Sequence, residues 1–185
     1  MEITDAFIGA QIFGFLTLVF SVISVQMKKR ANILLLFTIA AGFAGVVYWL
    51  LEAHSGFALN MIGAVACLLA AILARKDKLL PRWALAIFAF STIGVWALVY
   101  ETPIDVTVLM AQMFYFLALA VKEPNLVRAM MMLNMIGWMF YNISVGAFVN
   151  VANNTFFLIS DSIAMIRYRK VNKGKKRAKA KNHKR

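Results

Sequence analysis

The chain has 185 residues, of which 62% are hydrophobic, and its formal net charge is +12. Apolar stretches occupy almost its whole length, which leaves no room for a separate soluble enzyme domain. Most of the charge lies in one segment, because residues 167–185 contain 11 basic residues and no acidic residue. These features exclude a soluble globular protein and indicate a membrane domain with a basic tail.

Seven stretches are long enough to cross a membrane as helices, since a helix of about 20 residues spans a hydrocarbon core of about 30 Å. Their apolar residues are continuous rather than alternating, which favours helices over the strands of a barrel. In chain order the predicted spans are 6–25, 31–51, 57–74, 83–100, 104–121, 126–143 and 147–166. We therefore predict an all-α integral membrane protein with seven transmembrane helices.

The charges of the connections predict how the chain is oriented. All 20 Lys and Arg residues lie at alternate connections, within 28–30, 75–82, 122–128 and 167–185. The opposite side has acidic residues and one histidine but no Lys or Arg: Glu2, Asp5, Glu52, His54, Glu101 and Asp105. Basic short loops stay in the cytoplasm. The N-terminus is therefore predicted to lie outside and the C-terminus inside.

The chain also resembles itself. Residues 10–16 match 111–117 at five of seven positions, and 56–60, which begin with Gly and end with Asn, match 146–150. The matched helices cross in the same direction, because four helices separate the members of each pair. The sequence therefore predicts two parallel repeats of three helices joined by a linker helix, a 3+1+3 arrangement.

This arrangement divides the chain into a seven-helix membrane domain and a tail. The membrane domain is 1–170, with repeat one at about 6–76, the linker helix at 83–100 and repeat two at about 104–168. The tail, 171–185, lacks hydrophobic periodicity and is predicted to be disordered. Its basic residues are expected to attract anionic lipid headgroups, and nucleic-acid binding is not expected.

Parallel repeats of this kind are typical of carriers whose substrate site lies between the halves. The layout resembles the SWEET and PQ-loop transporters, in which a Pro-Gln pair in the first helix of each repeat helps to hinge the bundle. The corresponding pairs here are Ala10-Gln11 and Ala111-Gln112. The proline is missing from both, so the resemblance does not extend to a proline hinge.

A closer resemblance is to the YgjV family of bacterial inner-membrane proteins. It rests on Ala10-Gln11, Trp138, Tyr141-Asn142 before Gly146, and Ser160 through Arg167. It covers about 6–170, everything except the tail. The resemblance implies a multi-pass protein of the bacterial inner membrane and adds more about fold than about function.

Two Asn–Trp combinations are candidate solute-binding groups. Asn60 and Asn150 are equivalent in the two repeats, and Trp49 and Trp138 lie just before the matched segments. An amide offers a donor and an acceptor, and an indole face packs on the C–H surface of a ring, which suits a neutral solute such as a sugar. Asn can instead join helices, and Trp can anchor at the headgroup belt.

Further polar residues lie on otherwise apolar helices. Gln11 and Gln112 are equivalent in the repeats and either line a solute path or hydrogen-bond across the bundle. The last span has a polar stripe, with Phe157 inside it, whose members share one helix face: Asn150, Asn153, Asn154 and Asp161. Asp161 is a candidate ion-coupling group or, alternatively, the partner of Arg128 or Arg167.

The sequence thus predicts a carrier that moves a small neutral polar solute by alternating access, with no enzymatic activity, no metal and no cofactor. The alternative is a non-transporting scaffold that binds lipid or a partner through its basic tail. Expected partners are membrane lipids and a small-molecule substrate. The sequence does not decide between a monomer and a homo-oligomer.

Overall fold

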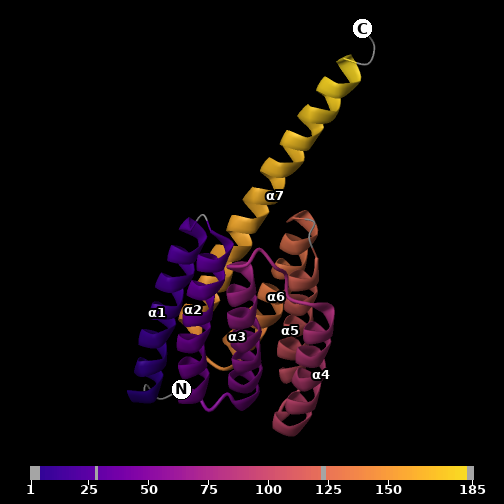
Figure 1. The fold of residues 1–185 in the computed structure, drawn as a ribbon. Coiled ribbons are helices and arrows are strands. Elements are labelled where there is room, and N and C mark those ends of the chain that lie inside the picture. The colour runs from indigo at the N-terminus through magenta and orange to yellow at the C-terminus, as the bar shows by residue number, and fades with distance from the viewer. Residues whose placement is uncertain (1–4, 28, 122–123, 183–185) are drawn as a thin grey trace.

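The computed structural model describes residues 5–27, 29–121 and 124–182, and these contain seven helices and no strand (Figure 1). The helices are α1 (Asp5–Gln26), α2 (Arg30–Leu50), α3 (His54–Ala74), α4 (Arg82–Val99), α5 (Asp105–Ala120), α6 (Pro124–Ser144) and α7 (Phe148–Asn182). Each predicted span falls on one helix, so the all-helical prediction is confirmed.

Four of these helices, α1 to α4, are long and apolar enough to cross a membrane. The helix α5 is apolar but has only 16 residues, slightly shorter than the predicted span 104–121. It begins late because the Asp105 carboxylate accepts hydrogen bonds from two backbone amides of the preceding turn, those of Glu101 and Thr102. This interaction holds 101–104 in a turn outside the helix.

The last helix is longer than its predicted span. The sequence predicted a membrane span to residue 166 and a disordered tail over 171–185, whereas α7 continues as a helix to Asn182. The segment is rich in Lys, Arg and Ala, which are good helix formers, and it contains no proline. In Figure 1, α7 projects well beyond the other helices. The side chains beyond Ile166 lie outside the described structure.

The helices pack as two groups of three. Helices α1, α2 and α3 pack in chain order, and so do α5, α6 and α7, while α4 contacts α3 and α5. The two groups meet where α1 packs on α7 and α3 packs on α5. Six helices therefore surround a common centre, and α4 lies outside it (Figure 1).

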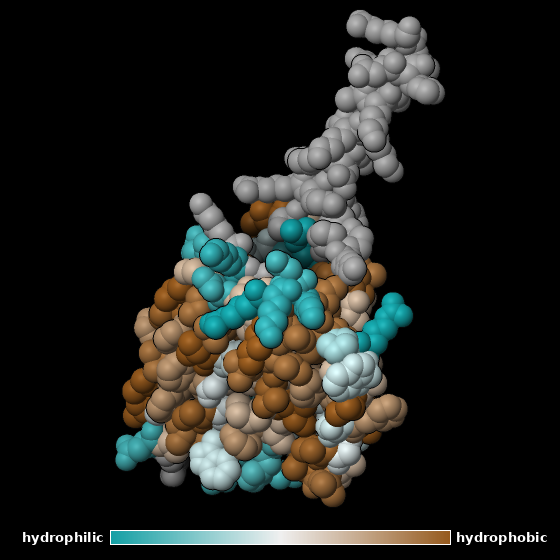
Figure 2. All heavy atoms as spheres, in the orientation of Figure 1, coloured by the Kyte–Doolittle hydropathy of each residue, from teal (hydrophilic) through white to brown (hydrophobic). Residues whose placement is uncertain are grey.

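The outer surface suits a lipid environment. Large apolar side chains face outward, among them Leu98, which is 86% exposed, and Phe90, which is 75% exposed. Figure 2 shows an apolar band across the face in view, with hydrophilic residues gathered toward its two ends. In water so wide an apolar surface would be unfavourable, whereas in a bilayer it contacts lipid.

Small residues allow close packing of α5 against α6. A Cβ added at Gly137 would lie 2.8 Å from the Ala111 Cβ and 2.8 Å from the Thr107 carbonyl oxygen. Both neighbours are too rigid to move aside, because one is a backbone atom and the other is a Cβ fixed to the backbone.

Gly137→Ala is therefore expected to lower the free energy of unfolding by about 1–3 kcal/mol, the usual cost of overpacking. The matched control is Gly94→Ala, where no atom lies within 4 Å of the added Cβ. This control should be neutral or stabilise by up to about 1 kcal/mol through helix propensity. Chemical unfolding in detergent measures both, and equal stabilities would contradict the packing argument.

Candidate functional site

A cavity of about 730 Å³ lies at the centre of the molecule. All helices except α4 line it, so it is formed between the two groups of three. Among the described residues, the first group contributes one amide side chain to its wall, that of Asn60. The second group provides Gln112, Asn134, Asn142, Asn150, Asn153 and Asn154.

The cavity extends to the helix connections at one end of the bundle. Its wall there includes Asp77 and Leu79 from the α3–α4 connection, together with Val121 and Val127 beside the α5–α6 connection. These are two of the connections that contain Lys and Arg. A solute could therefore enter from the end that the charge distribution predicts to be cytoplasmic.

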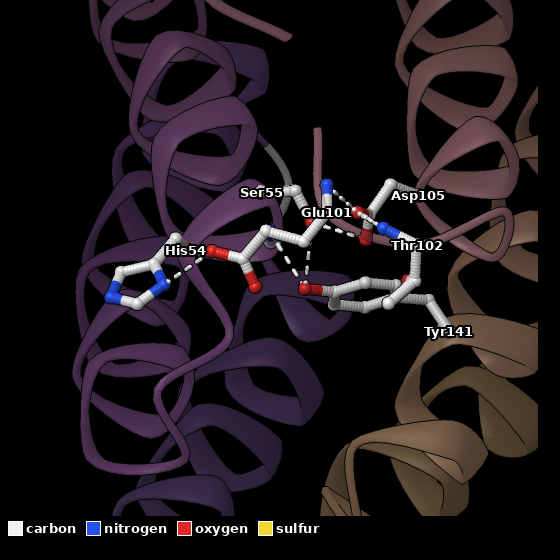
Figure 3. Close-up of polar contacts among 7 residues, drawn as sticks. His54, Ser55, Glu101, Thr102, Asp105 and Tyr141 are labelled. Carbon is white, nitrogen blue, oxygen red and sulfur yellow. Dashed lines mark hydrogen bonds and ion pairs between the residues drawn. The ribbon is translucent and has the colours of Figure 1, made fainter. Parts of the chain in front are cut away.

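A buried hydrogen-bonded cluster closes the opposite end (Figure 3). The Gly56 amide donates to the Tyr141 hydroxyl at 2.9 Å, and this hydroxyl also bonds to Ser55 Oγ at 2.9 Å. Ser55 Oγ in turn donates to Asp105 Oδ1 at 2.6 Å. Ser55 and Gly56 begin α3, whereas Asp105 begins α5 and Tyr141 lies in α6, so the cluster joins the two groups of helices.

The connection between α4 and α5 stabilises this closure. Asp105 Oδ2 accepts hydrogen bonds from the backbone amides of Glu101 and Thr102, both at 2.9 Å, and the Trp96 indole donates to the Asp105 carbonyl at 3.0 Å. At the rim, His54 Nδ1 lies 2.9 Å from Glu101 Oε1, and both side chains are more than half exposed. An exposed pair of this kind contributes little stability, so the buried cluster dominates the closure.

Aromatic rings separate the closed end from the amides. Tyr48 stacks on Trp138 with ring centres 5.4 Å apart, and it meets Tyr141 edge to face at 5.9 Å. The Tyr48 hydroxyl donates to Asn142 Oδ1 at 2.9 Å. Trp138, a predicted solute-binding residue, lies on the wall of the cavity. Tyr48 and Asn142 did not appear among the predicted site residues, although both place a polar group in a span.

The structure places Trp49 and Gln11 away from the cavity. Trp49 is 64% exposed and packs on Phe57 at the surface, in keeping with the headgroup-belt alternative. Gln11 Nε2 donates to the Gly146 carbonyl at 3.0 Å, and its Oε1 accepts from the Val149 amide at 3.2 Å. It thus joins α1 to the start of α7, directly after the positive φ of 77° at Gly146.

The α7 stripe turns toward the cavity over most of its length. Asn150, Asn153, Asn154 and Phe157 all line it and are buried. Asp161, one turn farther along, is only partly buried and does not line the cavity. It interacts electrostatically with Arg128 of α6, as the structural alternative anticipates. The side chain of Arg167, the other candidate partner, lies outside the described residues.

Tyr141 is the centre of the closed end, and its hydroxyl should matter for stability. Tyr141→Phe leaves the Gly56 amide and Ser55 without a shared partner, so a loss of about 1–3 kcal/mol in unfolding free energy is expected. Ser144→Ala is the control, because Ser144 is exposed and bonds only to its own helix. Its cost should stay below about 0.5 kcal/mol. Thermal unfolding in detergent compares them, and matching values would contradict a structural role for the cluster.

Comparison with known proteins assigns the chain to a family. A family model described as "Imp-YgjV: Bacterial inner membrane protein" matches residues 8–172. No curated protein and no solved structure matches the chain. The family match and the four long apolar helices agree with the location and fold expected from the sequence. The chain belongs to the Imp-YgjV family and is a multi-pass protein of the bacterial inner membrane.

Proposed function

We propose that this protein is a carrier, and not an enzyme, that moves a small neutral polar solute between α1–α3 and α5–α7 by alternating access. The observation that carries the proposal is the cavity, which lies between the two groups and extends to the α3–α4 and α5–α6 connections at one end of the bundle. Its volume of about 730 Å³ falls in the range of small-molecule sites, about 300–1,000 Å³.

The packing of the helices supports two related halves. If α1, α2 and α3 correspond to α5, α6 and α7, the contact of α1 with α7 corresponds to the contact of α5 with α3. Both contacts are present, and within each group the middle helix packs on the other two. This pattern is expected for parallel repeats related by an axis along the membrane normal, and it agrees with the repeats in the sequence.

With the basic connections in the cytoplasm, the present arrangement is an inward-facing state. The cluster of Ser55, Asp105 and Tyr141 is then the outer gate, because it joins the two halves on the side away from the opening. Transport requires this gate to break while the cytoplasmic end closes. A glycine or another non-proline element must provide the bending, since the paired prolines of the SWEET-like pattern are missing.

The outer gate provides a direct test of alternating access. His54 and Glu101 lie at its rim, and the chain has a single cysteine, Cys67. In a Cys67→Ala background, His54→Cys with Glu101→Cys can be joined by a short, membrane-impermeant bifunctional thiol reagent. Cross-linking should reduce uptake of radiolabelled sugars into proteoliposomes more than about tenfold, because binding energy alone cannot replace a blocked conformational step.

Each single cysteine variant, treated with the same reagent, is the control and should retain uptake. Reductive release of the link should restore uptake in the double variant. Full uptake by protein that is completely cross-linked would rule out opening at this gate.

The competing function is a scaffold that acts through the basic tail, and the projection of α7 beyond the bundle favours testing it. Truncation after Lys170 removes residues 171–185. A carrier should retain its uptake rate within about twofold after this truncation, since no lining residue of the cavity is lost. If the truncated protein folds and inserts into the membrane but loses uptake, the result would support a function that depends on the tail.

A further inference from the structure

We propose that the solute is held by the second group of helices alone, through amides whose counterparts in the first group have become structural. The inference deepens the proposed carrier function and rests on it. The proposed ligand-binding residues are Gln112, Asn150, Asn153 and Asn154. Each is more than nine-tenths buried and lines the cavity.

The two glutamines that are equivalent in the sequence have different environments. Both amide atoms of Gln11 bond to backbone at the entry to α7, to the Gly146 carbonyl and the Val149 amide, and Gln11 does not line the cavity. Gln112 lies on the cavity wall against Gly63. Its buried Nε2 has no hydrogen-bond partner within the described part of the chain. Of the two glutamines, only Gln112 has an amide nitrogen without a partner among the described residues.

The two equivalent asparagines are divided in the same way. Asn60 Nδ2 donates to the Ala41 carbonyl at 2.6 Å and so ties α3 to α2. Asn150 lies beside the Tyr48 hydroxyl, but neither atom of its amide makes a hydrogen bond of standard geometry among the described residues. The glutamine pair and the asparagine pair therefore differ in the same way. In each pair the amide of the first repeat hydrogen-bonds to the protein backbone, and the amide of the second repeat has at least one atom without a partner among the described residues.

Two more amides extend this group along α7. Asn153 and Asn154 follow Asn150 at i+3 and i+4 and so share its face. Asn153 Oδ1 and Asn154 Nδ2 are buried without partners in the described structure. Unpaired buried amides are unfavourable, and their terminal torsions turn easily. A solute that forms hydrogen bonds with these amides would remove this unfavourable free energy, and its binding would be stabilised accordingly.

The inventory of unpaired atoms selects the class of solute. It comprises three amide NH2 groups, on Gln112, Asn150 and Asn154, and two carbonyl acceptors, on Asn150 and Asn153. An anion would satisfy the donors but face the two carbonyl oxygens, and an ammonium would face the three donors. A hydroxyl both donates and accepts. A neutral solute with several hydroxyl groups fits best, with its C–H surface against Trp138.

The first test needs no ligand, because substitutions of the first-repeat and second-repeat amides are expected to change protein stability differently. Gln11→Leu and Asn60→Ala break hydrogen bonds and should lower the melting temperature of the purified protein. Gln112→Leu and Asn150→Ala remove unpaired amides and should leave it unchanged or raise it, as expected for groups kept for function rather than stability. A comparable drop for all four variants would overturn the proposal.

The second test measures binding by titration calorimetry on the full chain in detergent. The panel is glucose, ribose and sucrose, with gluconate and glucosamine as charged analogues. At least one neutral member should bind to the wild type, and Gln112→Leu and Asn150→Ala should each weaken it about tenfold, equivalent to about 1.4 kcal/mol. Asn60→Ala and the exposed α7 control Thr155→Ala should bind within about twofold of the wild type.

The outcomes separate this inference from the carrier function. Equal loss of affinity in Asn60→Ala and Asn150→Ala would mean a symmetric site and overturn the inference. Preference for a charged analogue, or no binding by any neutral member, would overturn the solute class. Sugar uptake into proteoliposomes tests the carrier function separately. Binding with the predicted asymmetry but without uptake would support the site and contradict the carrier.

Discussion

The hydrogen-bonding requirement of polar groups inside an apolar bundle organises this molecule. At lipid depth a polar side chain must bond to protein or face an aqueous cavity. Tyr141, Ser55 and Asp105 satisfy one another across the two groups of helices, and this closes one end. The amides that are not satisfied this way lie on the wall of the cavity. The closed end and the unpaired amides of the cavity wall therefore follow from the same requirement.

Local patterns predicted the elements well. Each of the seven spans became a helix because length and continuous hydropathy are properties of one segment and need no knowledge of its neighbours. The stripe of Asn150, Asn153 and Asn154 was also predictable, since residues at i, i+3 and i+4 share a helix face. The role of its last member was left open, because the sequence allowed an ion-coupling group or a partner of Arg128 or Arg167, and only the packed bundle places Asp161 partly buried and within electrostatic reach of Arg128 on α6.

What the sequence could not provide was the partner of each polar group. The repeat suggested equal roles for Gln11 and Gln112, yet one bonds to the backbone of α7 and the other does not. These differences depend on how distant helices approach one another, to within an ångström or so. Tyr48 was missed for the same reason, because only the packed bundle shows that it faces Trp138 and Asn142.

The length of α7 couples the interior to the exterior. Three of the amides that line the cavity, Asn150, Asn153 and Asn154, lie on the same continuous helix as the basic segment beyond the bundle, and this helix ends at Asn182. A helix rises 1.5 Å per residue, so a tilt of about 10° at Asn154 would displace the far end by about 7 Å. If a bound solute tilts α7, the projecting segment would act as a lever arm that turns a slight change near the cavity into a large displacement beyond the bundle.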